Sequence, residues 1–549
     1  MAQDMDRRTF LTAAGGAAAA TSMTAGCISG LVGEGGDGDG DGGGGGTLTY
    51  GRGAASSTLD PQATTSGEVA KVTNQVYDKL IGFEPGGSAL TESLATNFSL
   101  DGTTATLELR EGVTFHNGDE FTADDFIATY RRFLDEDYEY YVGEDGSIYG
   151  SYLLGVVDEV SADGDYTLTF ELNKRYAPFL ANLTVFALAV LPKSEIESGT
   201  DFATTMVGTS AFQFETMDEG SGLVRLSGYD DYYGEGPHVD EVVFEVISEN
   251  STRASSLNAG EVDIIDGLDA QTLTQVENGS GEVRRIKGMN VGYLALNMAQ
   301  FEPFRDKRVR KAMNYAVDTE EIAGSIYQGI ATAASQPITE DILGYNDELS
   351  VYEHDPEQAQ SLLEEAGYGD GFDLEVATFQ NPRAYNPSPV QAAETVASYL
   401  EDVGINVTIE QRTWESYLSY TGQGNHDAAF LGWMTDNGDP DNFYYALLHP
   451  QVDVPEGQDW VSWDTENYNT SNRAAWANSE FMDLVEQGQT TYNDDERAEL
   501  YQEAGAIFHE ECPWVPMVHA EEIRGVGPDV ENYVVELIGG PFLNQVQLS

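Results

Sequence analysis

FDLEVATF at 372–379 opens the stretch that decides the fold, which continues through INVTIEQ at 405–411 to AAFLGWM at 428–434. The first run reads as a strand, and the second alternates apolar and polar side chains as a half-buried strand does. The third is continuously apolar, which is typical of a parallel strand buried on both faces. The three runs therefore predict three strands of one buried sheet.

Two helices are expected between these strands. The longer one carries an apolar stripe at helical spacing, formed by Ala393, Val396, Leu400 and Val403. It ends at Gly404, and a shorter helical piece surrounds 414–420. The result is a β-α-β-α-β unit of the α/β class. Ligands of such sheets collect outside the carboxyl ends of the strands, where the loops here contain Arg383 and Asp436. The pattern thus nominates two opposite charges for one site.

Other runs extend the α/β pattern along the chain. ATLELR (105–110), YTLTFEL (166–172) and VDEVVFEVI (239–247) alternate as half-buried strands do. Between 305 and 317, helical spacing relates the apolar residues Val309, Ala312, Met313, Ala316 and Val317. The Arg and Lys residues on the opposite face of this helix are expected to be solvated; docking to a permease is the alternative.

The composition indicates a large, folded and very acidic protein. The 549 residues are 41% hydrophobic and 11% aromatic, enough for a core, and their number favours two lobes. With 94 Asp and Glu against 26 Lys and Arg, the net charge of -68 excludes nucleic acid as a partner. Because the acidic residues are spread over the whole chain, they indicate a salt-loving organism rather than an acidic patch for one partner; molar salt screens such self-repulsion.

The first residues are typical of an exported, lipid-anchored protein. Arg7 and Arg8 precede a weakly apolar run at 11–26, which resembles a twin-arginine export signal and is too short and polar for a membrane helix. Thr24 to Cys27 resemble a lipobox, so residues 1–26 are expected to be removed and Cys27 to carry lipid. One lipid alone anchors weakly, so a doubly anchored form is expected. Residues 27–46 are then a tether rich in Gly and Asp, and order begins at Thr47.

Cysteine and histidine usage gives no sign of a metal or a disulfide. Cys512 is the only cysteine besides Cys27, so we expect it to be a small buried residue without a disulfide partner. HEEC at 509–512 lacks the second histidine of a zinc helix, and no other pair has the spacing of a metal site. We expect neither a structural metal nor a cofactor.

Several long motifs resemble the family 5 solute-binding proteins of peptide and nickel importers. They are LDPQ (59–62), LATNFSLDGTTATLELREGVTFHNGDEFTADDFIATYRRF (94–133), FRDKRVRKAMNYAVDTEEI (304–322) and YEHDPEQAQSLLEEAGY (352–368). The resemblance covers 47–549 in the family's order. It implies a non-enzymatic, monomeric subunit on the extracytoplasmic face of the membrane, which passes its ligand to the permease subunits and ATPases of an ABC importer.

The resemblance also implies a fold, namely the two-lobe clamp of type II periplasmic binding proteins, also called a venus flytrap. Lobe one would comprise 47–290 and 516–549, with an extra subdomain at about 80–210. Lobe two would be 291–515, and the chain would cross between the lobes near Tyr293 and Val515.

Within the family, GWMTDNGDPDNF at 432–443 is similar to the branch that binds dipeptides. That branch holds the peptide ammonium with the first Asp of the motif, here Asp436, and the peptide carboxylate with the Arg of R-x-Y-N-P, here Arg383. It also stacks ligand near Trp433, whose alternative place is the core, and touches ligand with the backbone that matches Ser66 and Gly67. The bland alternatives are a turn cap for Asp436 and a surface salt bridge for Arg383. We expect Trp414 to be a core residue.

Other functions remain as alternatives. The solute could be a longer peptide, glutathione, an oligosaccharide or nickel, although nickel leaves Asp436 and Arg383 without a role. A secreted hydrolase is a distant alternative, because the sequence has no G-x-S-x-G elbow or Walker loop. A structural surface-layer protein is disfavoured because the chain has no internal repeats.

The lipobox generates the first prediction. Cys27→Ser should release the protein from membranes, because nothing else in the sequence anchors the chain. Fractionation after a salt wash measures this release. A variant that stays in the membrane fraction would show that the anchor lies elsewhere.

Overall fold

The computed structural model describes residues 45–147, 149–455 and 457–549. Arg7, Arg8, Cys27 and nearly all of the expected tether lie outside these residues. The first strand begins at Thr47, where the alternation of TLTY predicts one. In the described part of the chain, no helix is long and apolar enough to cross a bilayer.

Within the described residues, twelve strands form the principal sheet. Their order is β16 (Asn406–Arg412), β15 (Asp373–Phe379), β17 (Ala428–Met434), β13 (Asn290–Leu296), β18 (Trp514–Val526), β11 (Ile264–Ile265), β1 (Thr47–Arg52), β10 (Glu241–Val246), β9 (Leu223–Gly228) and β8 (Phe212–Asp218). Beside this path, β12 (Glu282–Lys287) and β14 (Ala331–Ala333) pair with β18. β10 is the strand that VDEVVFEVI predicts.

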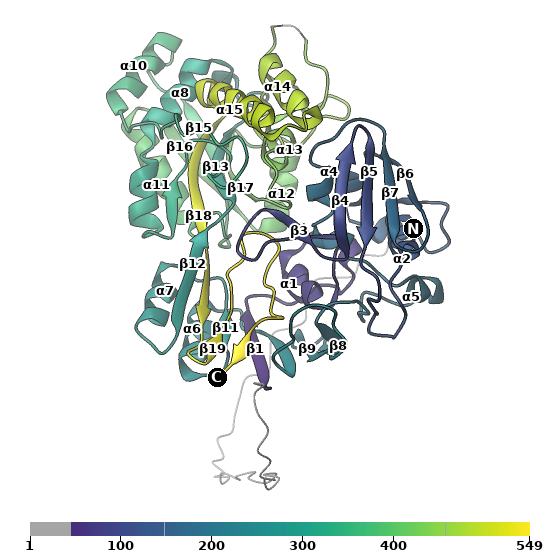
Figure 1. Ribbon diagram of the computed structural model, residues 1–549. Coiled ribbons are helices and arrows are strands. Elements are labelled where there is room, and N and C mark those ends of the chain that lie inside the picture. The colour runs from purple at the N-terminus through teal and green to yellow at the C-terminus, as the bar shows by residue number, and fades with distance from the viewer. Residues whose placement is uncertain (1–44, 148, 456) are drawn as a thin grey trace, which may run out of the picture. The chain divides into compact units, whose positions relative to one another are not determined.

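Strand β18 joins the two parts of this sheet (Figure 1, the long yellow arrow). Its first residues pair with β13, and the residues from Glu521 onward pair with β12. β12 runs into β13 through Gly288 and Met289. Opposite this junction, the side chain of Asn290 accepts from the backbone N–H of Ala520 at 2.9 Å and donates to its carbonyl at 2.8 Å. These bonds hold the two long segments together where they pass from one part of the sheet to the other.

The strands β5 (Thr104–Leu109) and β7 (Thr167–Leu172), which ATLELR and YTLTFEL predict, lie in a separate antiparallel sheet. Its order is β4 (Ala95–Asp101), β5, β7 and β6 (Val157–Ala162). Its helices are α2 (Ala123–Leu134), α3 (Tyr149–Leu154), α4 (Phe179–Asn182) and α5 (Lys193–Ser198). All but α5 pack on a hydrophobic core of their own between Leu80 and Val190. This arrangement confirms the extra subdomain as an antiparallel one.

The β-α-β-α-β unit is confirmed. β15 pairs in parallel with both β16 and β17, and α11 (Pro389–Asp402) and α12 (Trp414–Gly422) connect them. The predicted stripe of α11 is buried, and Gly404 follows in the left-handed region at φ +91°. The other long helices are α1 (Gly67–Val76), α6 (Asn250–Ala259), α7 (Ala270–Glu277), α8 (Lys307–Ala316), α10 (Pro356–Ala366), α13 (Asp441–Leu448), α14 (Ser479–Thr490) and α15 (Asp494–Glu511). Parallel pairing brings the carboxyl ends of β15 and β17 to one edge.

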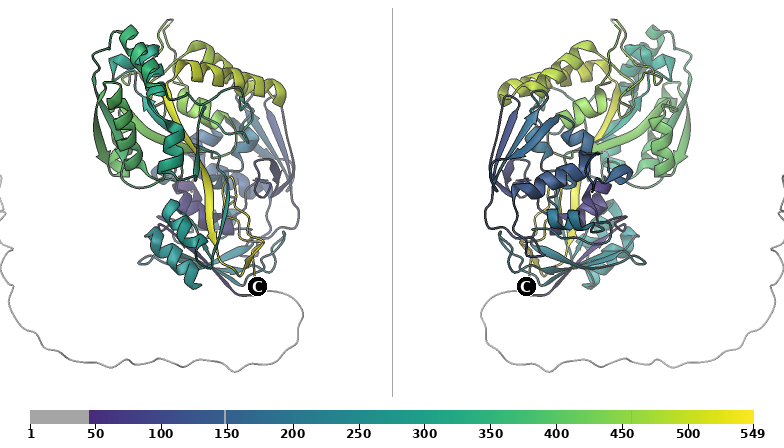
Figure 2. Two further views of the ribbon diagram at one scale, coloured as in Figure 1. Left: turned by 90° about the vertical axis from the view of Figure 1, so that its left-hand side faces the viewer. Right: turned by 90° about the vertical axis from the view of Figure 1, so that its right-hand side faces the viewer.

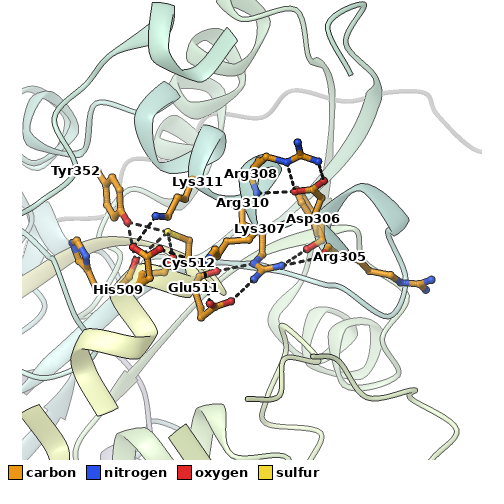
Figure 3. Close-up of polar contacts among 12 residues, drawn as sticks. Arg305, Asp306, Lys307, Arg308, Arg310, Lys311, Tyr352, His509, Glu511 and Cys512 are labelled. Carbon is orange, nitrogen blue, oxygen red and sulfur yellow. Dashed lines mark hydrogen bonds and ion pairs between the residues drawn. The ribbon is translucent and has the colours of Figure 1, made fainter. Parts of the chain in front are cut away.

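The basic face of α8 is not simply solvated, which corrects the expectation for 305–317. Arg310 is fully buried; its guanidinium donates to the Glu511 carboxylate at 3.0 Å and to the Glu511 carbonyl at 2.8 Å (Figure 3). Lys307 and Lys311 pair with Glu510 at 3.2 and 2.7 Å. Helical periodicity showed the apolar stripe correctly but could not show that the acidic end of α15 packs on the opposite face.

Cys512 is buried, as the sequence predicts, and ends α15 in the left-handed conformation. Its thiol donates to the Tyr352 hydroxyl at 3.2 Å, which in turn donates to the His509 carbonyl at 2.8 Å (Figure 3). Burial raises the pKa of the Cys512 thiol to about 11, so the thiol is protonated and unreactive.

The buried carboxylate of Asp441, at the start of α13, links the subdomain to α14. The subdomain and α14 lie side by side in Figure 2. Asp441 accepts from Tyr176 of the subdomain at 3.1 Å and from Gln489 of α14 at 3.0 Å. Beside it, Asp439 accepts two hydrogen bonds of 2.7 Å from Arg497. Burial, and then the negative charge of Asp439, raises the pKa of Asp441 to about 7.

This raised pKa predicts a pH dependence of stability. The folded chain holds the Asp441 proton more tightly than the unfolded chain does. The stability that this proton contributes is therefore complete below the ordinary pKa of 3.8 and is lost as the pH rises through about 7. Relative to wild type, Asp441→Asn should gain about 3 kcal/mol in free energy of unfolding between pH 5 and 8. Urea unfolding at constant molar KCl measures the free energy of unfolding of both proteins at each pH. A difference between them that does not change with pH would contradict the raised pKa of Asp441.

Candidate functional site

A cavity of about 1160 Å³ is lined by residues from Gly53 to Phe542, among them those of the loops after β15 and β17. All five ligand residues expected from the sequence line it: Ser66, Gly67, Arg383, Trp433 and Asp436. The structure thus brings together residues separated by as many as 370 positions along the chain.

The charge of the cavity wall differs from that of the protein. Its basic side chains are Lys71, Lys79, Arg253, Arg383, Arg473 and Arg524, and its acidic side chains are Glu68, Asp266, Asp269, Asp436, Glu521 and Glu522. Six charges of each sign stand against a net charge of -68 for the whole chain. Such a wall suits a ligand that carries charges of both signs.

Asp436 lies just beyond β17 and is held by neutral donors. Asn442 of α13 donates to its Oδ2 at 3.1 Å and accepts from its backbone N–H at 2.9 Å. Tyr149 of the subdomain donates to Oδ1 at 2.6 Å. Burial raises the pKa of Asp436, and these hydrogen bonds oppose the rise. Among the described residues, no cation pairs with this carboxylate.

Sequence reasoning missed both of these partners. Asn442 stands within GWMTDNGDPDNF, so its place in the motif was a signal that could have identified it. It also accepts from the indole N–H of Trp433 at 2.9 Å, and so it orients two expected ligand residues at once. Tyr149 comes from a helix 287 positions away, and nothing in the local sequence connects it with Asp436.

Arg383 lies in the loop after β15, which rests on two glycines. Gly292 of β13 and Gly432 of β17 face each other across the strand pair. The buried Tyr385 packs on both: a Cβ on Gly432 would lie 2.1 Å from its ring, and one on Gly292 would lie 2.4 Å from its carbonyl oxygen. Asn386 closes the loop by two backbone hydrogen bonds with Arg383. The missing side chains of the two glycines therefore set the height of the Arg383 loop above the sheet.

The Arg383 guanidinium lies over the ring of Trp414, 3.8 Å from its centroid. Its Nε is buried and has no hydrogen-bond partner, and no described carboxylate pairs with it. Burial lowers the pKa of Arg383, opposed by Tyr385. Trp414 was expected to be a core residue; it does pack against the core, but it is half-buried and lines the cavity beneath the cation.

Trp433, Ser66 and Gly67 border the cavity in different ways. Trp433 is half-buried near the end of β17, where it packs against the core and also lines the cavity. Ser66 precedes α1, and its side chain makes no capping hydrogen bond. Gly67 begins that helix, and a Cβ there would meet nothing within 4 Å. The first turn of α1 therefore presents backbone to open space at the cavity wall.

The close packing of Tyr385 on Gly292 and Gly432 generates a prediction. Gly432→Ala should lower the affinity for a dipeptide, the ligand expected from the sequence, by about tenfold or more, equivalent to about 1.4 kcal/mol. The reason is that the new Cβ must displace Tyr385 and with it Arg383. Gly324→Ala is the matched control, since a Cβ there meets nothing and the residue is exposed outside the cavity. Calorimetric titration of both variants, each shown to be folded by circular dichroism, measures the change. Wild-type affinity in Gly432→Ala would contradict the view that Gly432 positions Arg383 through Tyr385.

Known proteins are similar to this chain over most of its length. Residues 89–453 match the family described as bacterial extracellular solute-binding proteins, family 5. The dipeptide-binding protein of Escherichia coli K12 is 30% identical over 92% of this chain and 95% of its own. The heme-binding protein A of Haemophilus influenzae is 32% identical over 85% of this chain and 86% of its own.

A solved structure agrees with these relatives. The periplasmic binding protein DppA of Helicobacter pylori, associated with an ABC transporter and solved with the peptide STSA, has a TM-score of 0.78 and 31% identity, covering 92% of this chain and 98% of its own. The fold is thus the mixed α/β fold of periplasmic binding proteins, with the antiparallel subdomain added, and the chain has the non-enzymatic role of a solute-binding protein. The chain belongs to family 5 of the extracellular solute-binding proteins.

Proposed function

We propose that this substrate-binding protein of an ABC importer captures short peptides, dipeptides above all, as zwitterions. The carboxylate of Asp436 binds the peptide ammonium, and the guanidinium of Arg383 binds the peptide carboxylate. One observation carries the proposal. Two opposite charges line the same cavity, just beyond the carboxyl ends of the neighbouring parallel strands β15 and β17, and neither is ion-paired within the described residues.

The energetics of buried charge support this assignment. A guanidinium that is partly withdrawn from water and has no anion gains most from a ligand carboxylate, with which it forms two parallel hydrogen bonds. Asp436 is oriented by Tyr149 and Asn442 but is not neutralised, so an ammonium adds a charge-assisted bond to a carboxylate already in place. Trp433 and the first turn of α1, with Ser66 and Gly67, supply the surface between the two charges.

The relatives agree with a peptide ligand but also name another. The relative from Escherichia coli is a dipeptide-binding protein, and that from Helicobacter pylori was solved with the peptide STSA. The relative from Haemophilus influenzae, in contrast, is a heme-binding protein. A cavity of about 1160 Å³ is larger than a dipeptide needs, and this size is the observation that favours heme as the alternative ligand. No group of three or more metal-binding side chains occurs in the described residues, so nickel has no protein-built site there.

The rest of the transport role is proposed with the site. Export through the twin-arginine route would use Arg7 and Arg8, and lipid on Cys27 would hold the monomer at the extracytoplasmic face of the membrane, near the permease and its ATPases. Lobe one, 47–290 with 516–549, and lobe two, 291–515, would close on the peptide about the segments where β12 meets β13 and where β18 passes between them. Binding would persist in molar salt, because the enclosed charges are shielded from the ions that screen the surface.

Ligands that lack one charge test the proposal. A dipeptide should bind more tightly than its N-acetyl derivative, its C-amide, a tetrapeptide or heme, because a chain that advances about 3.3 to 3.6 Å per residue cannot place both ends of a tetrapeptide on a spacing that suits a dipeptide. Titration calorimetry at high KCl measures all five ligands. Equal affinity for the C-amide or the tetrapeptide would refute capture of both termini, and tighter binding of heme would replace the peptide as the ligand.

Asp436→Ala should weaken dipeptide binding by roughly 2 to 5 kcal/mol, the effect of removing one partner of an enclosed charge pair. Asp464→Ala removes an exposed carboxylate outside the cavity and is the matched control, which should leave affinity unchanged. If the two variants bind the dipeptide equally well, Asp436 is not the ammonium site.

A further inference from the structure

A second unpartnered guanidinium, that of Arg473, lines the cavity. It lies in the loop between α13 and α14, and Leu447 and Ser471 border the cavity beside it. No motif in the sequence pointed to it. Its Nε and Nη1 atoms are buried and have no hydrogen-bond partner, and no ion pair within the described residues includes this side chain.

This isolation distinguishes Arg473 from nearly all other arginines. Every other described arginine except Arg383 donates a side-chain hydrogen bond or pairs with a carboxylate, in a chain where acidic residues outnumber basic ones by 94 to 26. Arg497, for example, is buried and pairs with both oxygens of Asp439. Both arginines without a hydrogen-bond or ion-pair partner thus line the cavity, where a bound ligand could supply one.

Within the part of the chain that the structure describes, no acidic side chain pairs with Arg473. Its electrostatic neighbours are the hydroxyl groups of Tyr293, Tyr468 and Tyr417, and burial raises the pKa of each of these phenols above its ordinary value, so all three are neutral. A guanidinium remains charged at any pH the protein meets, and its planar donors match a carboxylate. The anion that completes this position therefore has to arrive with the ligand.

A simple dipeptide cannot supply it. Its one carboxylate is bound by Arg383 in the proposed function, on which this step rests, and its ammonium is bound by Asp436. We infer that Arg473 binds a second carboxylate, the side chain of an Asp or Glu residue in the bound peptide, and so makes the protein selective for acidic peptides. The inference follows from two unpartnered guanidinium groups in one cavity and a single terminal carboxylate to share between them.

Isosteric peptides test the inference. Ala-Glu with Ala-Gln, and Glu-Ala with Gln-Ala, differ in charge but hardly in shape, and titration calorimetry at molar KCl gives the affinity ratio of each pair. For wild type, at least one pair should favour Glu by about tenfold or more, the range of a hydrogen bond to a charged group. Arg473→Gln should bring that ratio close to one, and Arg473→Lys should keep part of it. Arg308→Gln, which removes an exposed guanidinium outside the cavity, should keep all of it.

The outcomes separate this inference from the proposed function. Ratios near one for both pairs in wild type, with Ala-Ala still bound, refute the acidic preference alone, whether or not the variants fold. A ratio that persists in Arg473→Gln also refutes it. If trialanine loses affinity in Arg473→Gln while the Glu/Gln ratios stay unchanged, Arg473 binds the terminus of a longer peptide and the inference fails. If wild type binds none of these peptides, the proposed function fails as well.

Discussion

Charge that is enclosed but not neutralised is the constraint on which the cavity depends. Arg383 is oriented by the ring of Trp414, and Asp436 by Tyr149 and Asn442, and none of these partners carries an opposite charge. An enclosed charge without a counter-ion is costly, so each group favours a ligand that brings one. The wall itself carries equal numbers of acidic and basic side chains, although the chain as a whole is strongly negative.

The sheet explains how these charges come to face one cavity. β15 and β17 are parallel neighbours, so the loops that carry Arg383 and Asp436 leave the same edge. The facing glycines Gly292 and Gly432 allow Tyr385 to lie directly on β13 and β17, which fixes the start of the first loop. Asn442 fixes the second loop from α13. The position of the Arg383 loop thus depends on two backbone positions that leave no room for an added carbon.

The local pattern of the sequence was enough to predict the β-α-β-α-β unit, the buried stripe of α11 and the positions of Arg383 and Asp436 after their strands. Periodicity and strand ends are local properties, and the family motifs added Ser66, Gly67 and Trp433, all of which line the cavity. Contacts between distant segments could not be predicted in this way. Tyr149 reaches Asp436 across 287 positions, and Arg310 is buried because α15 packs on a face of α8 that looks solvent-exposed in the sequence. Arg473 stands out only when the partners of every arginine are known.

The most direct test of two-ended recognition is a cycle that pairs changes in the protein with changes in the ligand. Affinities are measured for wild type, Asp436→Asn and Arg383→Gln, each with a dipeptide, its N-acetyl form and its C-amide. The account predicts a coupling of about 1.5 kcal/mol or more between Asp436→Asn and acetylation and between Arg383→Gln and amidation, with crossed combinations close to additive. Coupling of equal size in the crossed combinations, or additivity throughout, would contradict the assignment of the ammonium to Asp436 and of the carboxylate to Arg383.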